Sequence, residues 1–411
     1  MWEDEDSYLF NSYLSILPTE IILFIFKYLT AKDLVRCRGV CLRFKQIVDG
    51  QTGRDRIWRK HCKIDYPNIY KIARYKSQPD CLWYNIYRSL TLWPKLASAR
   101  EIYEEFSLVS KVSEEITDLK ILRNGVIAVH KQSGIFYYDI KTLKQTNRGP
   151  IAGLYLRYTE NDDVILIHSH HLHIIVLDKI TLQSKFTATA TLDEVKTFIL
   201  VDQDVYYVTL RDAICVCNLK NYRNRVITHS EDAVMSIGFS HNKLHVLTFQ
   251  RNVYTLNGMD LTFVCEIGPD CNLLHQLYYY NFFETIDWRI FHQWVYILNH
   301  RIPSGPLQSV VIIRTYGEVV FIGSNWGVLR IYNAPFTAGE LDLYNKKHTK
   351  QYNFMENSDF PVNSKCPILQ IDVSETKDGH TVVVAMPKKI AVLNFTHHFE
   401  RTVSVATSPY Q

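Results

Sequence analysis

Residues Leu17 to Leu29 read Leu-Pro-Thr-Glu-Ile-Ile-Leu-Phe-Ile-Phe-Lys-Tyr-Leu and predict the first helix of the N-terminal part. Pro18 is favoured at the first helical position, because its missing N–H would be unpaired there anyway. The helix that follows is apolar almost all round, so it should be covered on more than one side. A helix this short needs other helices, or a partner, to cover it.

Further helical signals follow at once. Thr30-Ala31-Lys32-Asp33 is a capping box that opens a second helix. A third helix has an apolar stripe at helical spacing, and Asp49-Gly50 stops it. The stripe consists of Val40, Cys41, Phe44, Ile47 and Val48. Trp58 falls in a further short helix. The sequence therefore predicts a small all-α module over residues 14–62.

This order of motifs resembles the F-box family, in which Leu-Pro-x-Glu, Ile-Phe-x-x-Leu, Asp-Leu, Val-Cys or Val-Ser, an aromatic residue and a terminal Trp follow one another. The family more often has Trp where this chain has Phe44, and residues 50–53 lengthen the last spacing slightly. The resemblance implies docking onto a Skp-type adaptor, which joins a cullin–RING ubiquitin ligase. The adaptor-binding residues that it implies are Leu17, Pro18, Ile21, Ile25, Phe26, Leu29, Leu34, Val40, Cys41, Phe44 and Trp58. A generic helical bundle without such a partner is the alternative.

The chain's positive charge is concentrated beside this module. Between Thr30 and Lys76 there are 13 Lys or Arg and 4 Asp or Glu, a larger surplus than the net +4 of the whole chain. Such a patch suits nucleic acid, anionic lipid or an acidic protein. No zinc-finger, basic-zipper or RNA-binding signature accompanies it, so we expect an acidic adaptor rather than nucleic acid.

The bulk composition is that of an intracellular globular protein. The chain has 411 residues, 47% of them hydrophobic, which suits two or three domains. Residues 1–13 form an acidic tail unlike a secretory signal, and no apolar run is long enough to span a membrane. Nine cysteines are too sparse for a disulfide scaffold, so we expect reduced thiols. The expected location is the cytoplasm, the nucleus or both.

Residues 63–105 are predicted to form a helical linker. Trp83, Ile86, Tyr87 and Leu90 fall on one helical face, and Trp93-Pro94 ends that helix. The segment resembles the connector between the F-box and the substrate domain in F-box/WD-repeat proteins. The role that we infer is a rigid spacer, which does not exclude ordinary core packing.

Residues 106–411 change to a two-residue period and repeat a unit of strands and tight turns. The third strand of each unit ends in Asp or Asn, at spacings of roughly 40 residues. These strands are 135–139, 174–178, 214–218, 253–257, 295–299, 329–333 and 390–394. Such a period is typical of propeller blades. The pattern loosely resembles WD-repeat propellers, although the Trp-Asp and Gly-His pairs are absent.

The fold class that we predict is therefore α+β multidomain: a small helical F-box module, a helical linker and an all-β propeller. Seven blades are favoured over six or eight. Either Phe106 to Val112 or Arg401 to Val405 is expected to supply the outer strand that closes the ring. A β-sandwich is the alternative, but it would be complete within about 150 residues, half the length of this region.

Few residues suggest chemistry. His168 and His170 share a strand face, but no acidic or Cys partner completes a metal site, so we expect a solvated hairpin. Cys37 and Cys41 are expected to be small core residues, and Cys215 and Cys217 buried thiols. No phosphate loop, nucleophile elbow or paired-carboxylate motif is present. We therefore expect no catalysis, no cofactor and no metal.

The sequence thus predicts a non-catalytic substrate receptor of an SCF-type ubiquitin ligase. Its partners would be the Skp-type adaptor, through it the cullin and RING subunits, and an unidentified target protein, with no nucleic acid and no membrane. A non-degradative scaffold that binds the adaptor is the alternative. The candidate substrate-binding residues on the propeller are Arg211, Arg251, Arg289 and Arg330, since related propellers read phosphorylated targets with arginines.

Overall fold

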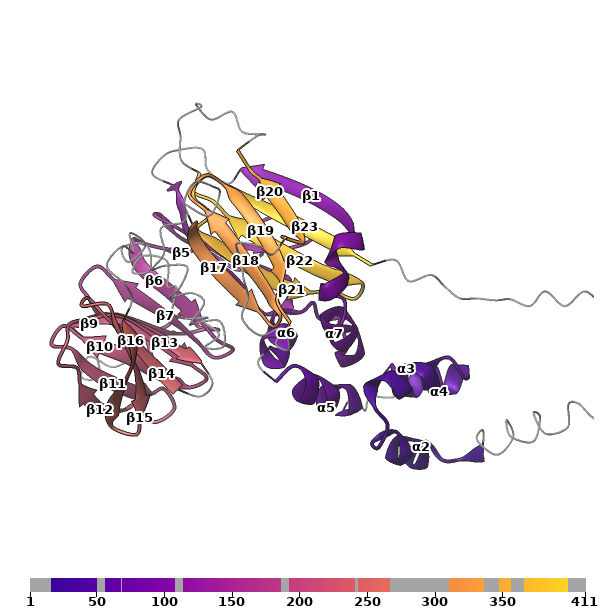
Figure 1. Ribbon diagram of the computed structural model, residues 1–411. Helices are drawn as coiled ribbons and strands as arrows, with labels where there is room; N and C mark the ends of the chain where they lie inside the picture. Colours follow the sequence, from indigo (N-terminus) through magenta and orange to yellow (C-terminus); the bar gives the residue numbers. More distant parts are fainter. Residues whose placement is uncertain are drawn as a thin grey trace, which may run out of the picture.

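The computed structural model describes residues 16–49, 56–67, 69–107, 114–185, 192–240, 243–266, 310–335, 347–355 and 366–397. Helices come first and antiparallel sheets follow (Figure 1). The helices are α2 (Thr19–Phe26), α3 (Ala31–Arg38), α4 (Leu42–Val48), α5 (Arg56–Asp65), α6 (Tyr70–Lys76), α7 (Trp83–Leu90) and the 3-10 helix η1 (Trp93–Ser98). No helix in these ranges is long and apolar enough to cross a membrane.

The helix ends predicted from the sequence are found in the structure, and one of them differs by one residue. Thr30 Oγ1 accepts a hydrogen bond from the backbone N–H of Asp33 at 3.2 Å, which confirms the predicted cap of α3. Pro18 takes the N-cap of α2, one position before the predicted one. Asp49 is the C-cap of α4, and Trp93 with Pro94 begins η1 directly after α7.

The first four helices share one hydrophobic core. Its buried members are Ile22, Leu23, Phe26, Ala31, Leu34, Phe44, Ile47, Val48, Ile57, Trp58 and Tyr84. Trp58 lies at its centre, 1% exposed, and its indole N–H donates to the carbonyl of Val48. Tyr84 comes from α7, so this core is completed by a helix beyond the module itself.

The strands form six antiparallel sheets within the described residues. The first three sheets contain β2 (Ile116–Ile121), β3 (Val126–Lys131), β4 (Gly134–Asp139) and β5 (Ile151–Ala152); β6 (Tyr155–Glu160), β7 (Val164–Ser169) and β8 (Ile174–Asp178); and β9 (Val195–Val201), β10 (Asp204–Thr209), β11 (Ala213–Asn218) and β12 (Arg223–His229). The next two contain β13 (Val234–Ser240), β14 (Lys243–Thr248), β15 (Asn252–Asn257) and β16 (Asp260–Glu266); and β17 (Val310–Tyr316), β18 (Val319–Ser324), β19 (Val328–Asn333) and β20 (Lys350–Asn353). The last contains β21 (Gln370–Glu375), β22 (Gly379–Ala385), β23 (Lys389–Thr396) and β1 (Arg100–Ser107).

The predicted repeat is found in these sheets. β4, β8, β11, β15, β19 and β23 are each the third strand of a sheet and coincide with six of the predicted third strands. The seventh, 295–299, lies outside the described residues. The first strands of neighbouring sheets contact one another: β2 contacts β21, and β9 contacts β13. These first strands therefore lie on the inner side of the propeller. The architecture is an N-terminal helical part followed by a β-propeller, as predicted.

The last sheet is completed by a strand from before the repeats. β1 pairs antiparallel with β23 from Arg100–Thr396 to Ser107–Lys389. It starts six residues before the predicted Phe106 and shares only Phe106 and Ser107 with that prediction, while 401–405 lies outside the described residues. Consequently the helical part of the linker ends at Ser98, and its predicted extension to residue 105 is wrong.

Charge explains why β1 does not look like a strand. Its sequence is rich in glutamates, and two of them are paired with lysines of neighbouring strands. Glu101 lies 3.2 Å from Lys350 Nζ, and Glu105 lies 3.0 Å from Lys389 Nζ. These pairs place acidic residues on an outer strand, where a purely apolar pattern is not required.

The helices α6 and α7 pack against the end of the last sheet (Figure 1). One hydrophobic core contains both linker and propeller residues, including Ile86, Leu90 and Trp93 together with Ile371, Val382 and Phe395. α7 therefore contributes Tyr84 to the core of the first helices and Ile86 and Leu90 to that of the propeller.

A buried polar network joins the same elements. Glu375 at the end of β21 accepts hydrogen bonds from Ser89 of α7, from Trp93 Nε1 at 3.0 Å and from His380 Nδ1 at 2.7 Å. The ring of His380 stacks on Trp93 with 3.8 Å between centroids. Burial raises the pKa of Glu375, but the charge of His380 and these hydrogen bonds outweigh it and hold the pKa below its usual value. The carboxylate is thus kept charged and fully hydrogen-bonded.

A second buried contact joins α6 to β21, the first strand of the last sheet. Lys76 Nζ forms an ion pair with Asp372 Oδ1, and the other carboxylate oxygen accepts from the backbone N–H of Ile121 at 2.7 Å. The carbonyl of Lys76 accepts from Ser374 Oγ at 2.8 Å. Asp372 is thereby shared by α6, β21 and β2.

Lys76→Met should lower the free energy of unfolding by about 3–5 kcal/mol, because it leaves the buried Asp372 carboxylate without its counter-charge. Lys76→Met combined with Asp372→Asn should recover a substantial part of that loss. Guanidinium unfolding of the two variants measures the difference. Equal stability of the single and double variants would contradict this account of the pair.

Candidate protein-docking sites

Helix α2 leaves an apolar face uncovered. Ile22, Leu23 and Phe26 point into the core, and the opposite face is exposed. The exposed fractions there are 46% for Ile21, 55% for Phe24, 44% for Ile25 and 76% for Tyr28. Phe24 and Tyr28 are one helical turn apart, and the centroids of their rings are 5.4 Å apart. Large exposed apolar surfaces of this kind mark sites of interaction with other molecules.

The predicted adaptor-binding residues divide into three groups. Pro18, Ile21, Ile25, Val40 and Cys41 are exposed. Leu17 and Leu29 are half-buried. Phe26, Leu34, Phe44 and Trp58 are buried in the core of the first helices, where they support the surface and do not belong to it.

Motif matching missed part of the exposed set. Phe24 and Tyr28 lie on the uncovered face of α2, while Val35 and Leu42 are exposed on α3 and α4. The spacing carried a signal: once Ile22, Leu23 and Phe26 are assigned to the core, Phe24 and Tyr28 must lie on the other side of the helix. The prediction that Cys41 is a core residue is wrong. It is exposed and caps α4, its sulfur accepting from the N–H of Phe44 at 3.4 Å.

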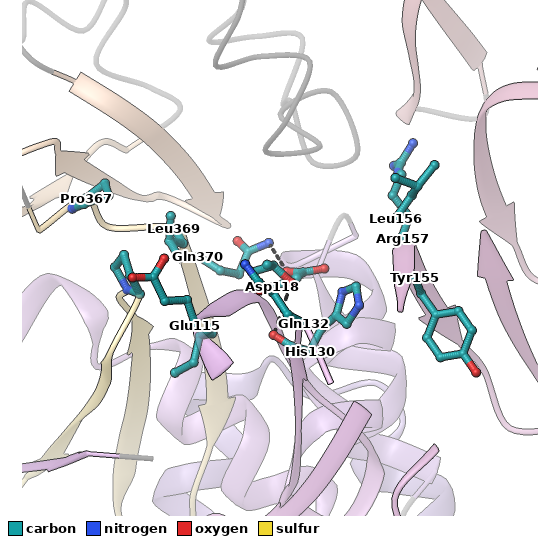
Figure 2. Close-up of a pocket in the computed structure, with 13 residues that line it drawn as sticks. Glu115, Asp118, His130, Gln132, Tyr155, Leu156, Arg157, Pro367, Leu369 and Gln370 are labelled. Carbon is teal, nitrogen blue, oxygen red and sulfur yellow. Dashed lines mark hydrogen bonds between the residues drawn. The ribbon is translucent and has the colours of Figure 1, made fainter. Parts of the chain in front are cut away.

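A pocket of about 480 Å³ opens where the first strands β2, β6 and β21 begin (Figure 2). It is lined by Glu115, Ile116, Thr117, Asp118, His130, Gln132, Tyr155, Leu156, Arg157, Pro367, Leu369, Gln370 and Pro387. In Figure 2, Tyr155, Leu156 and Arg157 lie on one side of the pocket and Glu115, Asp118 and Gln370 on the other. Pockets of this size with a few placed polar groups are typical of binding sites.

Hydrogen bonds fix several groups of this pocket. Asp118 Oδ1 accepts from Gln370 Nε2 at 3.1 Å (Figure 2), and Arg157 donates to Thr197 Oγ1 at 2.8 Å. His130 is buried, and burial lowers its pKa, so the imidazole is neutral at physiological pH. The wall therefore combines fixed polar groups with the apolar Leu156 and Leu369, a mixture suited to a peptide segment.

The pocket and the helices lie at opposite ends of the strands. The pocket is lined by the starts of β2 and β21, whereas the helices contact the ends at which those strands finish. Arg88 of α7, for example, bonds to the carbonyl of Lys377 and to Asp378 in the turn after β21. The exposed face of α2 is thus carried on the side of the propeller away from the pocket.

The candidate arginines are not brought together in this pocket. Arg211 is exposed in the turn between β10 and β11, and Arg251 lies in the turn between β14 and β15. Arg330 on β19 donates to Gln351 at 2.8 Å, and Arg289 lies outside the described residues. None of the three described arginines lines the pocket.

The histidine cluster is only partly solvated. His168 is buried on β7 and its Nε2 lies 2.9 Å from the carbonyl of Val195, whereas His170 and His171 in the turn are exposed. Cys215 and Cys217 are buried thiols, as predicted. In the described ranges no three His, Cys, Asp or Glu side chains are grouped so as to hold a metal ion.

A family model described as F-box-like matches residues 14–64. This chain carries an F-box-like domain. The matched residues run from before α2 almost to the end of α5, and they include the uncovered apolar face of α2. The chain matches no curated protein.

Among solved structures, the propeller is similar to the WD40 domain of Neurospora crassa Pan2. That match has 9% identity and a TM-score of 0.46, and covers 73% of this chain and 97% of the other. The designed protein Ika8 gives 9% identity, a TM-score of 0.43 and coverages of 71% and 98%. Kluyveromyces lactis Hsv2 matches with 9% identity and a TM-score of 0.33, and the match covers 66% of this chain and 78% of the other.

Truncation of two phenylalanines of α2 should lower the free energy of unfolding by very different amounts. Phe26→Ala removes a buried ring and should cost about 3–5 kcal/mol of stability, whereas Phe24→Ala removes an exposed ring and should cost well under about 1 kcal/mol. Urea unfolding of both variants measures this. A large loss in Phe24→Ala would show that the α2 face is covered within the protein.

Proposed function

We propose that this protein is the substrate-recognition subunit of an SCF-type ubiquitin ligase. The F-box-like domain binds a Skp-type adaptor, and through it the cullin and RING subunits, while the propeller binds a target protein. The observation that carries this proposal is the uncovered apolar face of α2 within a matched F-box-like domain.

Adaptor binding would use the exposed residues and not the whole predicted set. Ile21, Phe24, Ile25 and Tyr28 supply apolar contacts, and burial of such surface contributes about 25 cal/mol per Å². Phe26, Leu34, Phe44 and Trp58 act indirectly, because they fix the position of α2 on the other helices.

The placement of the pocket supports the target-binding part. It lies at the far end of the strands from the F-box-like domain, so a bound target would stay clear of the adaptor. Holding the target at a fixed place raises the effective concentration of its lysines near the charged ubiquitin carrier. The chain itself would form no covalent bond, acting as a receptor in the cytoplasm, the nucleus or both.

Ile21→Asp combined with Ile25→Asp should abolish co-purification of a Skp-type adaptor, because two charges would be desolvated in an apolar interface. The matched control is Ile64→Asp with Ile72→Asp, two exposed isoleucines of α5 and α6, which should bind normally. Circular dichroism checks that both variants fold. A folded α2 variant that still retains the adaptor would refute the docking assignment.

Leu156→Glu changes a half-exposed residue of the pocket and should remove the target while keeping the adaptor. Leu182→Glu, at a similarly exposed residue outside the pocket, is the matched control. Proximity labelling in cells, compared with a chain lacking residues 1–62, separates target from ligase partners. Unchanged labelling by Leu156→Glu would contradict the pocket assignment, and adaptor labelling without cullin would favour a non-degradative scaffold.

A further inference from the structure

A second pocket, of about 440 Å³, lies between the helices and the propeller. Its cationic lining comes from three elements: Arg59 of α5, Lys71 and Arg74 of α6, and Arg123 of η3 (Arg123–Gly125), the turn that follows β2. Asp162 is the one carboxylate among its described lining residues. The pocket thus gathers a local charge of +3 at a junction of two parts of the protein.

Much of the basic surplus around the F-box-like domain is already used inside the protein. Arg38 is paired with Asp49 at 2.6 Å, Lys76 with Asp372, and Arg43 donates to the carbonyl of Leu17. Arg59 and Lys71 differ, because both are exposed and neither has an ion-pair partner in the described part of the chain. Among the cations that line this pocket, these two are the ones for which the described residues provide neither a side-chain hydrogen bond nor an ion pair.

The other polar groups of the pocket differ in how firmly they are held. Arg74 donates to the carbonyl of Cys81 and lies over the ring of Trp83, 5.8 Å from its centroid. Arg123 is tied to Asp162 at 3.2 Å, with both side chains at least half exposed, so this pair is easily exchanged. The Tyr75 hydroxyl is buried without a hydrogen-bond partner among the described residues, and burial raises its pKa, so it stays a donor.

We propose that this pocket binds a small anion carrying two or more phosphate groups. Guanidinium groups match phosphate oxygens with paired hydrogen bonds, and Arg59, Arg74 and Arg123 supply three of them. A lining with four cations and one carboxylate favours a ligand with more than one negative charge. A volume of about 440 Å³ falls within the range of small-molecule pockets, roughly 300–1,000 Å³, which favours a small anion over a large acidic partner.

The bound anion would cross-link the domains. Arg59 belongs to the F-box-like domain, Lys71 and Arg74 belong to α6, and Arg123 lies in the turn between β2 and β3 of the propeller. A ligand that binds only the folded arrangement stabilises it by mass action. The site would therefore make the junction between the two binding surfaces stiffer when phosphate-rich metabolites are abundant.

The test is isothermal titration calorimetry of the full chain with tripolyphosphate, at about 150 mM salt to screen weak surface attraction. Arg59→Ala with Lys71→Ala should weaken binding about tenfold or more, since two charge-assisted hydrogen bonds are lost. The matched control is Lys45→Ala with Lys63→Ala, which removes the same charge from exposed positions outside the pocket. The control should bind tripolyphosphate with an affinity within about twofold of that of the unaltered chain.

Thermal unfolding gives a second readout. Tripolyphosphate should raise the melting temperature of the unaltered chain and of the control, but not that of Arg59→Ala with Lys71→Ala, and sulfate at equal ionic strength should have no such effect. Absence of binding by the unaltered chain would overturn the proposal. So would an equal loss in both double variants, which would show unspecific attraction, or full binding by the pocket variant, which would place the anion elsewhere.

Discussion

Helix α7 belongs to two hydrophobic cores at once, and this double packing sets the position of the F-box-like domain on the propeller. Tyr84 contacts Trp58 on one side, with 5.1 Å between ring centroids, while Ile86 and Leu90 pack against the last sheets on the other. A helix held on both sides cannot turn without opening one of the cores. The exposed face of α2 and the pocket across the propeller are thus fixed relative to each other.

Buried polar groups make this junction specific. Glu375 and Asp372 lie on the innermost strand of the last sheet, where an unpaired carboxylate would be very costly. Besides His380 and the N–H of Ile121, which belong to the propeller, their partners come from the helices: Ser89 and Trp93 for Glu375, and Lys76 for Asp372. The propeller is therefore complete only when the helices are docked, which makes the linker a part of its core as well as a spacer.

The sequence predicted the parts of this fold that depend on local patterns. The cap at Thr30, the helical face from Trp83 to Leu90 and the third strands of six sheets are set by side chains that are neighbours in the chain. The closing strand was misplaced because its glutamates are matched by lysines far away in sequence. The pairing of Lys76 with Asp372 was hidden for the same reason, since almost 300 residues separate them.

At the candidate site, too, the sequence predicted what depends on local patterns and missed what depends on packing between distant residues. The F-box motif identified the right helices, but it did not separate Ile21 and Ile25, which are exposed, from Phe26 and Trp58, which support them from within. That distinction depends on which face of α2 the other helices cover. That the basic residues suit an acidic adaptor stays a prediction. The structure places Arg59, Lys71 and Arg74 in one pocket lining with Arg123, a residue that no local pattern connects with them.

The central claim is that α7 holds the F-box-like domain and the pocket face in one fixed arrangement. It is tested most directly by a distance measurement between spin labels at Lys32 of α3 and Leu154 beside the pocket, both exposed. For this measurement Cys37, Cys41, Cys265 and Cys271 are replaced by serine. Double electron–electron resonance should give one narrow distance distribution that is unchanged when a Skp-type adaptor is added. A broad or two-peaked distribution would show that the two parts move independently and would contradict the account.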